Sequence, residues 1–313
     1  MNFERNPKHP SHSVTMLQGM ENLYKKRVGI DVCFVFKECP EVRISAQKLV
    51  LMSVSEVFVT MFLGSLPEGD EIVIKDPEID SEAFQRLIKY IYTGRAQFDW
   101  ENIEKFLYLA HKYDISSLKA DCSKYLSNNL TRSRSCYILG LADLYDTKDL
   151  VEKCTRFISQ HGLSSQSSED LLQLSLGLII KIAKKGPKSP RNFKIVLKWL
   201  KHECKRQKLA QTPENFRKII GDHIYLFEFS SFPIEEIENW VCPSGLLNDT
   251  ELFKIMLERA KKTEKNPGLA PRREAGAANL DEWGNRRNEE IWEDWGGRDV
   301  LDDDVYIDDP HAW

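Results

Sequence analysis

Three side chains that can bind a metal ion stand next to one another in the sequence, at His202, Glu203 and Cys204. Consecutive residues of a helix project in different directions, so these three cannot share one ion. His111 and His223 stand in apolar contexts that are typical of structural histidines. The sequence also lacks a phosphate-binding glycine loop, a G-x-S-x-G nucleophile elbow and an H-E-x-x-H zinc motif. We therefore expect no catalytic residue, no metal and no cofactor.

A different question, whether another protein docks on the chain, is raised by the connector "TMFLGSLPEGDEIVIKD", from Thr60 to Asp76. Within it Leu66 stands among polar residues and is directly followed by Pro67 and Glu68. Because proline fixes its own φ, Pro67 could hold its two neighbours in one presentation and lower the entropy cost of binding. Single exposed leucines are common on folded surfaces, so the connector alone does not decide between a docking site and an ordinary surface turn.

A second candidate for binding is the acidic end of the chain. Residues 281–313 contain twelve Asp and Glu against three Arg, a net charge of −9, so with −4 for the whole chain residues 1–280 carry +5. Such a segment repels phosphate, which argues against a nucleic-acid partner. We expect its tryptophans to dock into a partner protein; the alternative is that the segment packs onto the chain's own helical region or does little. They are Trp283, Trp292, Trp295 and Trp313.

Length and composition limit what these segments belong to. With 313 residues, 42% of them hydrophobic and 29% charged, the chain is expected to form about two soluble domains. There is no apolar run long enough to span a membrane and no secretory signal at the start, so we expect a cytoplasmic or nuclear protein without a membrane partner. Seven cysteines at irregular spacings, without a C-x-x-C pair, predict buried free thiols in a reducing compartment.

The elements around the connector mix helices and strands. Residues 1–14 are polar and expected to be disordered. Hydrophobic periodicity then predicts a helix at residues 16–23, two strands joined by a turn at 29–46, a helix at 46–62 and a strand at 70–76. Three further helices are predicted at residues 81–94, 100–114 and 116–130. Asp80 is the expected N-cap and Gly94 the expected end of the helix over residues 81–94.

After Leu130 the patterns are helical, with a helix pair over residues 133–161 and further helices beyond it. The segment "HIYLFEF", at residues 223–229, is the one candidate for another strand. Residues 261–280 are rich in Lys, Glu, Pro, Gly and Ala without apolar periodicity, which predicts a flexible linker.

Four stretches in the first half resemble the BTB (POZ) domain. They are "DVCFVF" at Asp31–Phe36, "SAQKLVLMSVSEVFVTMF" at Ser45–Phe62, "IKYIYTG" at Ile88–Gly94 and "FLYLAHKYDISSLKADCSKYL" at Phe106–Leu126. The resemblance implies an α+β fold, a small sheet with helices, over residues 15–127. Gln47 stands where the family usually has a histidine, and glutamine can fill the same partly buried hydrogen-bonding position.

The second half resembles the BACK domain that follows BTB in many adaptor proteins. The resemblance lies in the helix pair over residues 133–161 and in "FKIVLKWLKHECKRQ" at Phe193–Gln207. It implies an all-α domain over residues 128–260, followed by the linker at 261–280 and the acidic tail at 281–313. The match looks closest to the group in which a PHR sandwich follows BACK, but the sequence contains neither that sandwich nor kelch repeats.

The BTB resemblance implies a homodimer built on the first helix and the strands beside it. The alternative is that this helix packs only on its own chain, because its periodicity does not distinguish the two. In the family's dimers an aspartate and a basic residue also come together near the interface. The residues that match these positions are Met16, Leu17, Met20 and Leu23 on the helix, and Asp31 and Lys48 as the charged pair.

BTB followed by BACK further implies a substrate adaptor of a cullin-3 ubiquitin ligase, whose protein substrate the sequence does not identify. In that family a hydrophobic-x-Glu motif after the third BTB helix contacts the cullin, and Leu66, Pro67 and Glu68 match it. Tyr108 and Tyr113 are the further cullin-binding residues that the resemblance implies. The alternative is a dimeric scaffold that binds no cullin and presents the tryptophan tail to a transcriptional or ribonucleoprotein partner.

Overall fold

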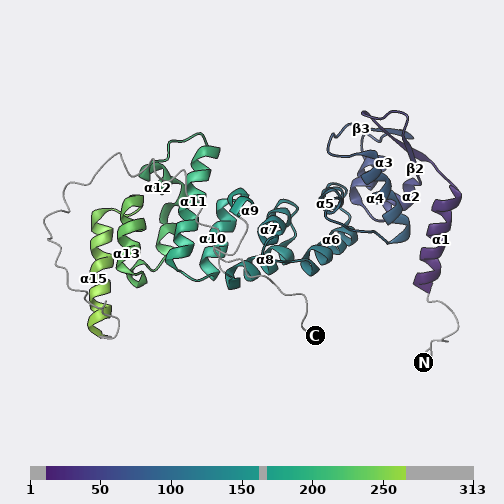
Figure 1. Ribbon diagram of the computed structural model, residues 1–313. Coiled ribbons are helices and arrows are strands. Elements are labelled where there is room, and N and C mark those ends of the chain that lie inside the picture. The colour runs from purple at the N-terminus through teal and green to yellow at the C-terminus, as the bar shows by residue number, and fades with distance from the viewer. Residues whose placement is uncertain (1–11, 162–167, 266–313) are drawn as a thin grey trace, which may run out of the picture. The chain divides into compact units, whose positions relative to one another are not determined.

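The computed structural model describes residues 12–161 and 168–265 (Figure 1). The chain divides after Ala260 into two units, and the first of them contains the sheet and the hydrophobic core. The tail tryptophans Trp283, Trp292, Trp295 and Trp313 lie outside the described residues, as do the predicted linker beyond Lys265 and residues 1–11. The first described element is helix α1 (His12–Lys26), which is longer than the predicted helix and starts within the segment expected to be disordered.

A three-stranded sheet lies at the centre of the N-terminal half. β1 (Val32–Phe36) pairs antiparallel with β2 (Arg43–Ala46) and parallel with β3 (Glu71–Ile74), so the strand order is β2-β1-β3. Phe34 in the middle strand lies opposite Ile44 and Ile72, and all three side chains are buried. The predicted strands are confirmed, and every second residue of β3 is buried, as the alternation indicates.

Helix α4 (Ser81–Thr93) forms between the two predicted end signals. The Asp80 carboxylate accepts a hydrogen bond from the Ala83 N–H at 2.7 Å, as an N-cap does. Gly94 ends the helix with a φ of +62°, a left-handed conformation that favours glycine. α1 packs against α4, and the rings of Tyr24 and Tyr92 lie 5.2 Å apart.

The prediction of one helix over residues 46–62 is wrong, because the segment forms α2 (Lys48–Met52) and α3 (Glu56–Leu63). Ser55 separates them: its hydroxyl accepts from the Phe58 N–H at 3.2 Å and donates to the carbonyl oxygen of Tyr113. A serine that bonds to the backbone in this way favours a cap over a continuous helix. The break leaves Leu49, in the second position of α2, 75% exposed.

Helices α5 (Ile103–Lys112) and α6 (Ser116–Asn128) complete the N-terminal half. Its core is aromatic: the Phe34 and Phe84 rings lie 4.8 Å apart, and the Phe58 and Tyr113 rings stack at the same separation. Such pairs add specific geometry to the burial of large apolar area. The predicted α+β class is confirmed.

The C-terminal half is helical throughout its described residues. Its elements are α7 (Ser135–Leu144), α8 (Lys148–His161), α9 (Ser168–Gln173), α10 (Leu176–Lys185), α11 (Pro190–Arg206), α12 (Pro213–Ile220), η2 (Gly221–Leu226), η3 (Phe229–Ser231), α13 (Ile234–Glu236), η4 (Ile237–Val241), α14 (Cys242–Ser244) and α15 (Asp249–Lys265). Two predictions need correction. "HIYLFEF" forms no strand, since η2 takes up its first residues and packs Ile224 into the core, and α15 continues four residues past Lys261 into the predicted linker.

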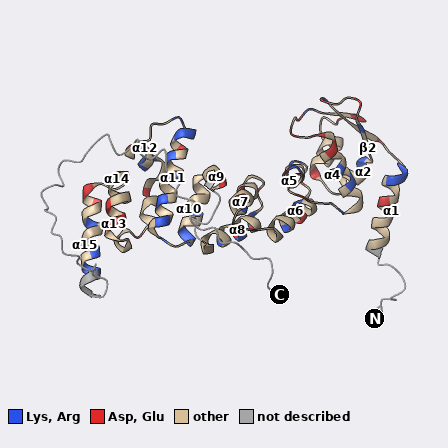
Figure 2. Cartoon of the chain, in the orientation of Figure 1, with Lys and Arg blue, Asp and Glu red and all other residues tan. Residues whose placement is uncertain are grey.

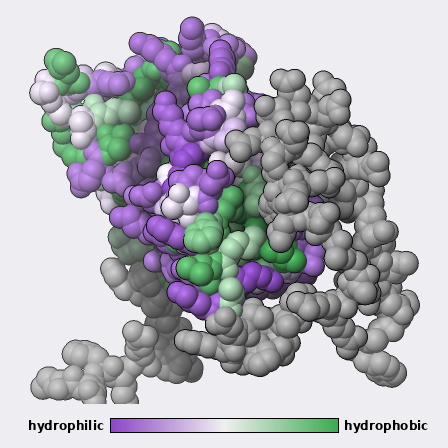
Figure 3. All heavy atoms as spheres, turned by 90° about the vertical axis from the view of Figure 1, so that its left-hand side faces the viewer, coloured by the Kyte–Doolittle hydropathy of each residue, from purple (hydrophilic) through white to green (hydrophobic). Residues whose placement is uncertain are grey.

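One face of this half carries exposed apolar side chains. Phe253 of α15 is 69% exposed and Leu257 46%. Figure 3 views the molecule from the side on which α15 lies in Figure 1 and shows hydrophobic residues gathered on part of that face. Isolated exposed apolar residues are normal on protein surfaces.

Within the described ranges, no helix combines the length and apolarity that crossing a membrane requires.

All seven cysteines lie in the described part of the chain and are free. Burial is confirmed for Cys122, Cys136, Cys154 and Cys204, whereas Cys33, Cys39 and Cys242 are half-buried. Burial raises the pKa of the Cys136 and Cys154 thiols to about 12. These thiols are therefore protonated and unreactive at neutral pH.

Candidate protein-docking surface

The connector after α3 presents its leucine to solvent on a fixed backbone. Leu66 is 90% exposed. The Glu68 N–H donates to the Met61 carbonyl at 2.9 Å, which ties the connector back to α3. At Gly64 an added Cβ would lie 2.3 Å from the Thr60 carbonyl oxygen, so only glycine allows this tight exit from the helix. Leu66 is therefore a protruding apolar side chain on a backbone that is already ordered. Binding a partner through it would cost little backbone conformational entropy.

Two further leucines and an ion pair flank this knob. Leu63 at the end of α3 is 70% exposed, and Leu49 lies at the exposed start of α2. The Lys48 ammonium pairs with Asp70 at 2.7 Å and lies 5.5 Å from the centre of the Phe62 ring. These contacts hold the start of α2 beside the end of α3 and beside Asp70 of the connector. Neither leucine was predicted from the sequence to be exposed.

The two predicted tyrosines have different surroundings. Tyr113 is only 2% exposed and stacks on Phe58, so its side chain cannot make the surface contact that the resemblance implies. Burial raises the pKa of its hydroxyl well above the ordinary value. Tyr108 is half-buried and donates its hydroxyl to Asp76, the last residue of the connector. Tyr108 is therefore in position to border a docking surface, and Tyr113 supports that surface from within the core.

Asp76 joins the connector to α5. Its carboxylate accepts hydrogen bonds from the Lys112 ammonium and from Tyr108, and the same ammonium lies 5.7 Å from the centre of the Tyr108 ring. The bond from Lys112, and then the bond from Tyr108, lower the pKa of Asp76 from 3.8 to about 2. Burial and the neighbouring carboxylate raise the pKa of Tyr108 to about 12. Asp76 is ionised and Tyr108 neutral at physiological pH, so the bond between them is charge-assisted.

The same edge of α5 continues onto α7. The Tyr108 and Tyr145 rings meet edge to face with their centres 6.5 Å apart, and Tyr137 donates its hydroxyl to Glu104 at 3.1 Å. The Arg134 guanidinium lies 3.9 Å from the centre of the Trp100 ring. Side chains of the C-terminal half therefore adjoin Tyr108 and the neighbouring part of α5.

The predicted dimer residues divide between the surface and the core of the chain. On α1, Met16 is 55% exposed and Leu17 49%, whereas Met20 and Leu23 are half-buried. Two exposed apolar residues on one turn suit a second copy of the chain.

Within the single chain Asp31 and Lys48 lie together without an ion pair between their side chains, and the pair implied for the dimer stays a prediction. The Asp31 carboxylate accepts instead from the backbone N–H of Lys48, at 2.7 Å, and the Lys48 ammonium pairs with Asp70. Gln47, at the N-cap position of α2, makes no side-chain cap bond, so Asp31 supplies the acceptor from the residue before β1. Within the chain Asp31 therefore caps the first backbone N–H of α2, and the Lys48 side chain is neutralised by Asp70.

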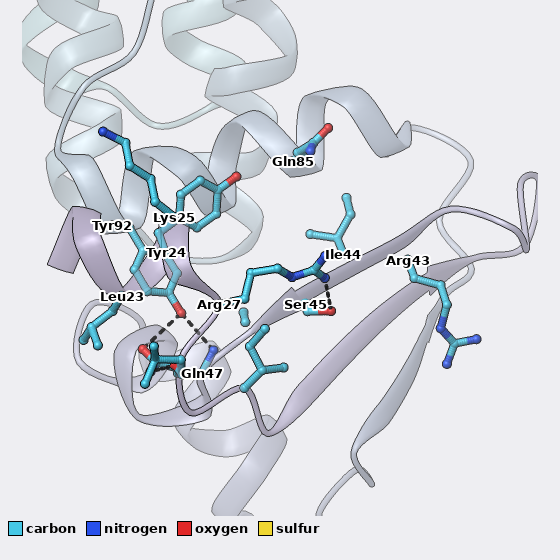
Figure 4. Close-up of a pocket in the computed structure, with 13 residues that line it drawn as sticks. Leu23, Tyr24, Lys25, Arg27, Arg43, Ile44, Ser45, Gln47, Gln85 and Tyr92 are labelled. Carbon is cyan, nitrogen blue, oxygen red and sulfur yellow. Dashed lines mark hydrogen bonds between the residues drawn. The ribbon is translucent and has the colours of Figure 1, made fainter.

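A pocket of about 270 Å³ separates the end of α1 from β2 and α4 (Figure 4). Arg27 donates to the Ser45 hydroxyl at 3.0 Å across it. The Gln47 N–H donates to the Tyr92 hydroxyl at 2.9 Å, and its side-chain amide donates to the Val28 carbonyl. The predicted hydrogen-bonding role of Gln47 is confirmed, and these bonds anchor the chain that follows α1.

The residues first considered as metal ligands lie apart from this surface. Among the described residues no group of three or more His, Cys, Asp and Glu side chains could hold a metal ion. His202, Glu203 and Cys204 lie on one helix, where Glu203 is engaged by Arg206 at 2.7 Å and Cys204 is buried. What the site presents is a rigid apolar knob with polar and aromatic neighbours.

Comparison with known families matches both halves of the chain. The BTB/POZ domain matches residues 20–130, and the domain described as BTB And C-terminal Kelch, or BACK, matches residues 135–219. The chain is a BTB-BACK protein. Proteins with these two domains typically act through protein–protein contacts as non-catalytic adaptors, and the combination is typical of cullin-3 adaptors.

Relatives of this BTB-BACK protein come from several vertebrates. BTB/POZ domain-containing protein 6 of Mus musculus is 30% identical over 284 residues, which are 86% of this chain and 52% of the relative. Protein 6 of Xenopus laevis is 31% identical over 243 residues (74% and 46%), and BTB/POZ domain-containing protein 3 of Homo sapiens is 29% identical over 242 (74% and 46%). The chain thus spans about half the length of these relatives.

Proposed function

We propose that this BTB-BACK protein is a substrate-specific adaptor of a cullin-3 RING ubiquitin ligase. It forms a homodimer through the BTB domain and recruits a protein target through the BACK domain or the acidic tail. We place it in the cytoplasm, the nucleus or both, where such ligases work.

The observation that carries the proposal is the presentation of Leu66. An apolar side chain 90% exposed on a backbone tied to α3 suits insertion into a partner's pocket, where a buried anchor supplies most of the binding energy. It lies in a BTB domain, at the hydrophobic-x-Glu motif that the family resemblance connects with cullin binding, and a BACK domain follows.

The mechanism is recruitment. The BTB surface holds the cullin and a separate surface holds the target, so the target stays at high effective concentration near the ubiquitin-loaded arm. A homodimer would carry two such arms and would bind a target with two sites more tightly than a monomer. No step requires a catalytic side chain of this chain.

Co-purification from cells tests the proposal. The full-length protein should recover cullin-3, and Leu66→Ala combined with Glu68→Lys should lose it, because the side chains of both residues are exposed and their removal leaves the core intact. A matched control, Phe253→Ala with Glu258→Lys on α15, removes one exposed apolar side chain and reverses one exposed carboxylate elsewhere. Equal cullin recovery by all three proteins would sink the assigned site and favour the scaffold without cullin.

A further inference from the structure

The BACK domain contains a strongly basic stretch that cullin binding does not use. Residues 181–218 contain thirteen Lys and Arg against two Glu, a net charge of +11 in a chain whose total is −4. Figure 2 shows the Lys and Arg of this stretch in blue, many of them on α10 and α11. The next stretch, residues 219–260, has eight acidic residues against two basic ones, a net of −6. Charge is therefore segregated within the domain.

On α11 five of the six Lys and Arg residues share one side of the helix. They recur at spacings of three and four residues, which places them in one stripe along the axis. Phe193, Val196 and Leu200 on the opposite side are buried in the core. We call the stripe the basic face of α11; it consists of Arg191, Lys194, Lys198, Lys201 and Lys205.

Few carboxylates neutralise this face. Lys194, at its edge, pairs with Glu236 at 2.9 Å and lies 4.2 Å from the centre of the Trp240 ring. The exposed side chains of Lys198 and Lys205 form no ion pair with any residue in the described ranges. Burial and the nearby charge of Lys205 lower the pKa of Lys201, as expected where cations crowd together. An anion placed along the face would relieve this repulsion.

We propose that the basic face of α11 binds an acidic segment of a partner protein. From Arg191 to Lys205 the face is about 21 Å long at 1.5 Å per residue, which about six or seven residues of an extended peptide would cover. Aspartate or glutamate side chains on such a segment would reach the successive lysines, and Trp240 at the edge offers an apolar contact. The inference is independent of the proposed cullin binding.

A polypeptide fits this face better than a nucleic acid. Four of its five cations are lysines, whereas the planar guanidinium of arginine is the group that forms paired hydrogen bonds to one phosphate or base. Glu236 lies at its edge and the acidic residues 219–260 follow in the same domain, so a long phosphate backbone would also meet repulsive groups. A short acidic peptide can cover the lysines alone.

Fluorescence anisotropy with the full-length protein tests the inference. The probe is a labelled peptide of about twelve residues that alternates Glu and Ser, long enough to exceed the face, and the reference probe has Gln for Glu. Lys198→Glu with Lys205→Glu should weaken binding of the acidic probe by about tenfold or more and flatten its salt dependence. Lys198→Arg with Lys205→Arg should retain binding. The matched control, Lys37→Glu with Lys124→Glu, changes net charge equally at exposed positions of the BTB domain and should stay within about twofold.

Three results would overturn the inference. Equal weakening by Lys198→Glu/Lys205→Glu and by the BTB control would show a general charge effect. Tighter binding of a DNA duplex, sensitive to the same two lysines, would assign the face to nucleic acid. Binding that appears only after the six aspartates of residues 299–309 are changed to asparagine would show that the chain's own acidic residues occupy the face, which would exclude a partner as its resident ligand.

Discussion

At the scale of single residues, Asp76 joins the end of the connector to α5. Its partners Tyr108 and Lys112 are 32 and 36 residues away in the sequence, so no local pattern could indicate the cluster. Leu66 differs, because its position among polar residues was visible in the sequence and its side chain is indeed exposed. Its role in binding a cullin stays a prediction.

The lowered pKa of Asp76 predicts a pH dependence. The folded-state pKa lies below the unfolded value of 3.8, so the carboxylate stabilises the fold fully above that value, and this contribution is lost as pH falls towards about 2. Asp76→Asn should therefore lower the free energy of unfolding by about 1 kcal/mol at neutral pH. Thermal melts of both proteins should differ at pH 7 and converge as the pH approaches the folded pKa. A difference that does not change with pH would contradict the role of the charge.

At the scale of elements, the start of α2 depends on an acceptor that comes from the chain before β1. Asp31→Ala should cost about 1 kcal/mol of unfolding free energy, because it leaves the Lys48 N–H without its partner. Asp31→Asn keeps an acceptor and should cost clearly less. Urea unfolding of the three proteins distinguishes this cap from the ion pair implied by family resemblance, for which both substitutions would be equally harmful.

Local signals predicted some elements well and others not at all. The strands and α4 follow from alternation, from the Asp80 cap and from Gly94, all of which act within a few residues. The break between α2 and α3 depends on Ser55 bonding to the carbonyl of Tyr113, 58 residues away, and on a core that accepts the Tyr113 ring. For the same reason the sequence could not show that Tyr113 is buried while Tyr108 reaches the surface.

At the scale of the whole molecule, the exposed part of α1 predicts a dimer. Met16→Lys with Leu17→Lys should place two charges in the interface and shift the protein to a monomer of 36.3 kDa. Light scattering after size exclusion measures this, with Phe253→Lys/Leu257→Lys on α15 as a control that should stay dimeric. A wild-type protein that is already monomeric would contradict the proposed dimer.

The most direct test of the adaptor proposal is the affinity of the purified full-length protein for the N-terminal region of cullin-3, measured by calorimetry. We expect binding by the wild type, a loss of about tenfold to a hundredfold in Leu66→Ala/Glu68→Lys, as for a central anchor, and little change in Phe253→Ala/Glu258→Lys. No detectable binding by the wild type, or equal affinity of the wild type and the connector variant, would contradict the account.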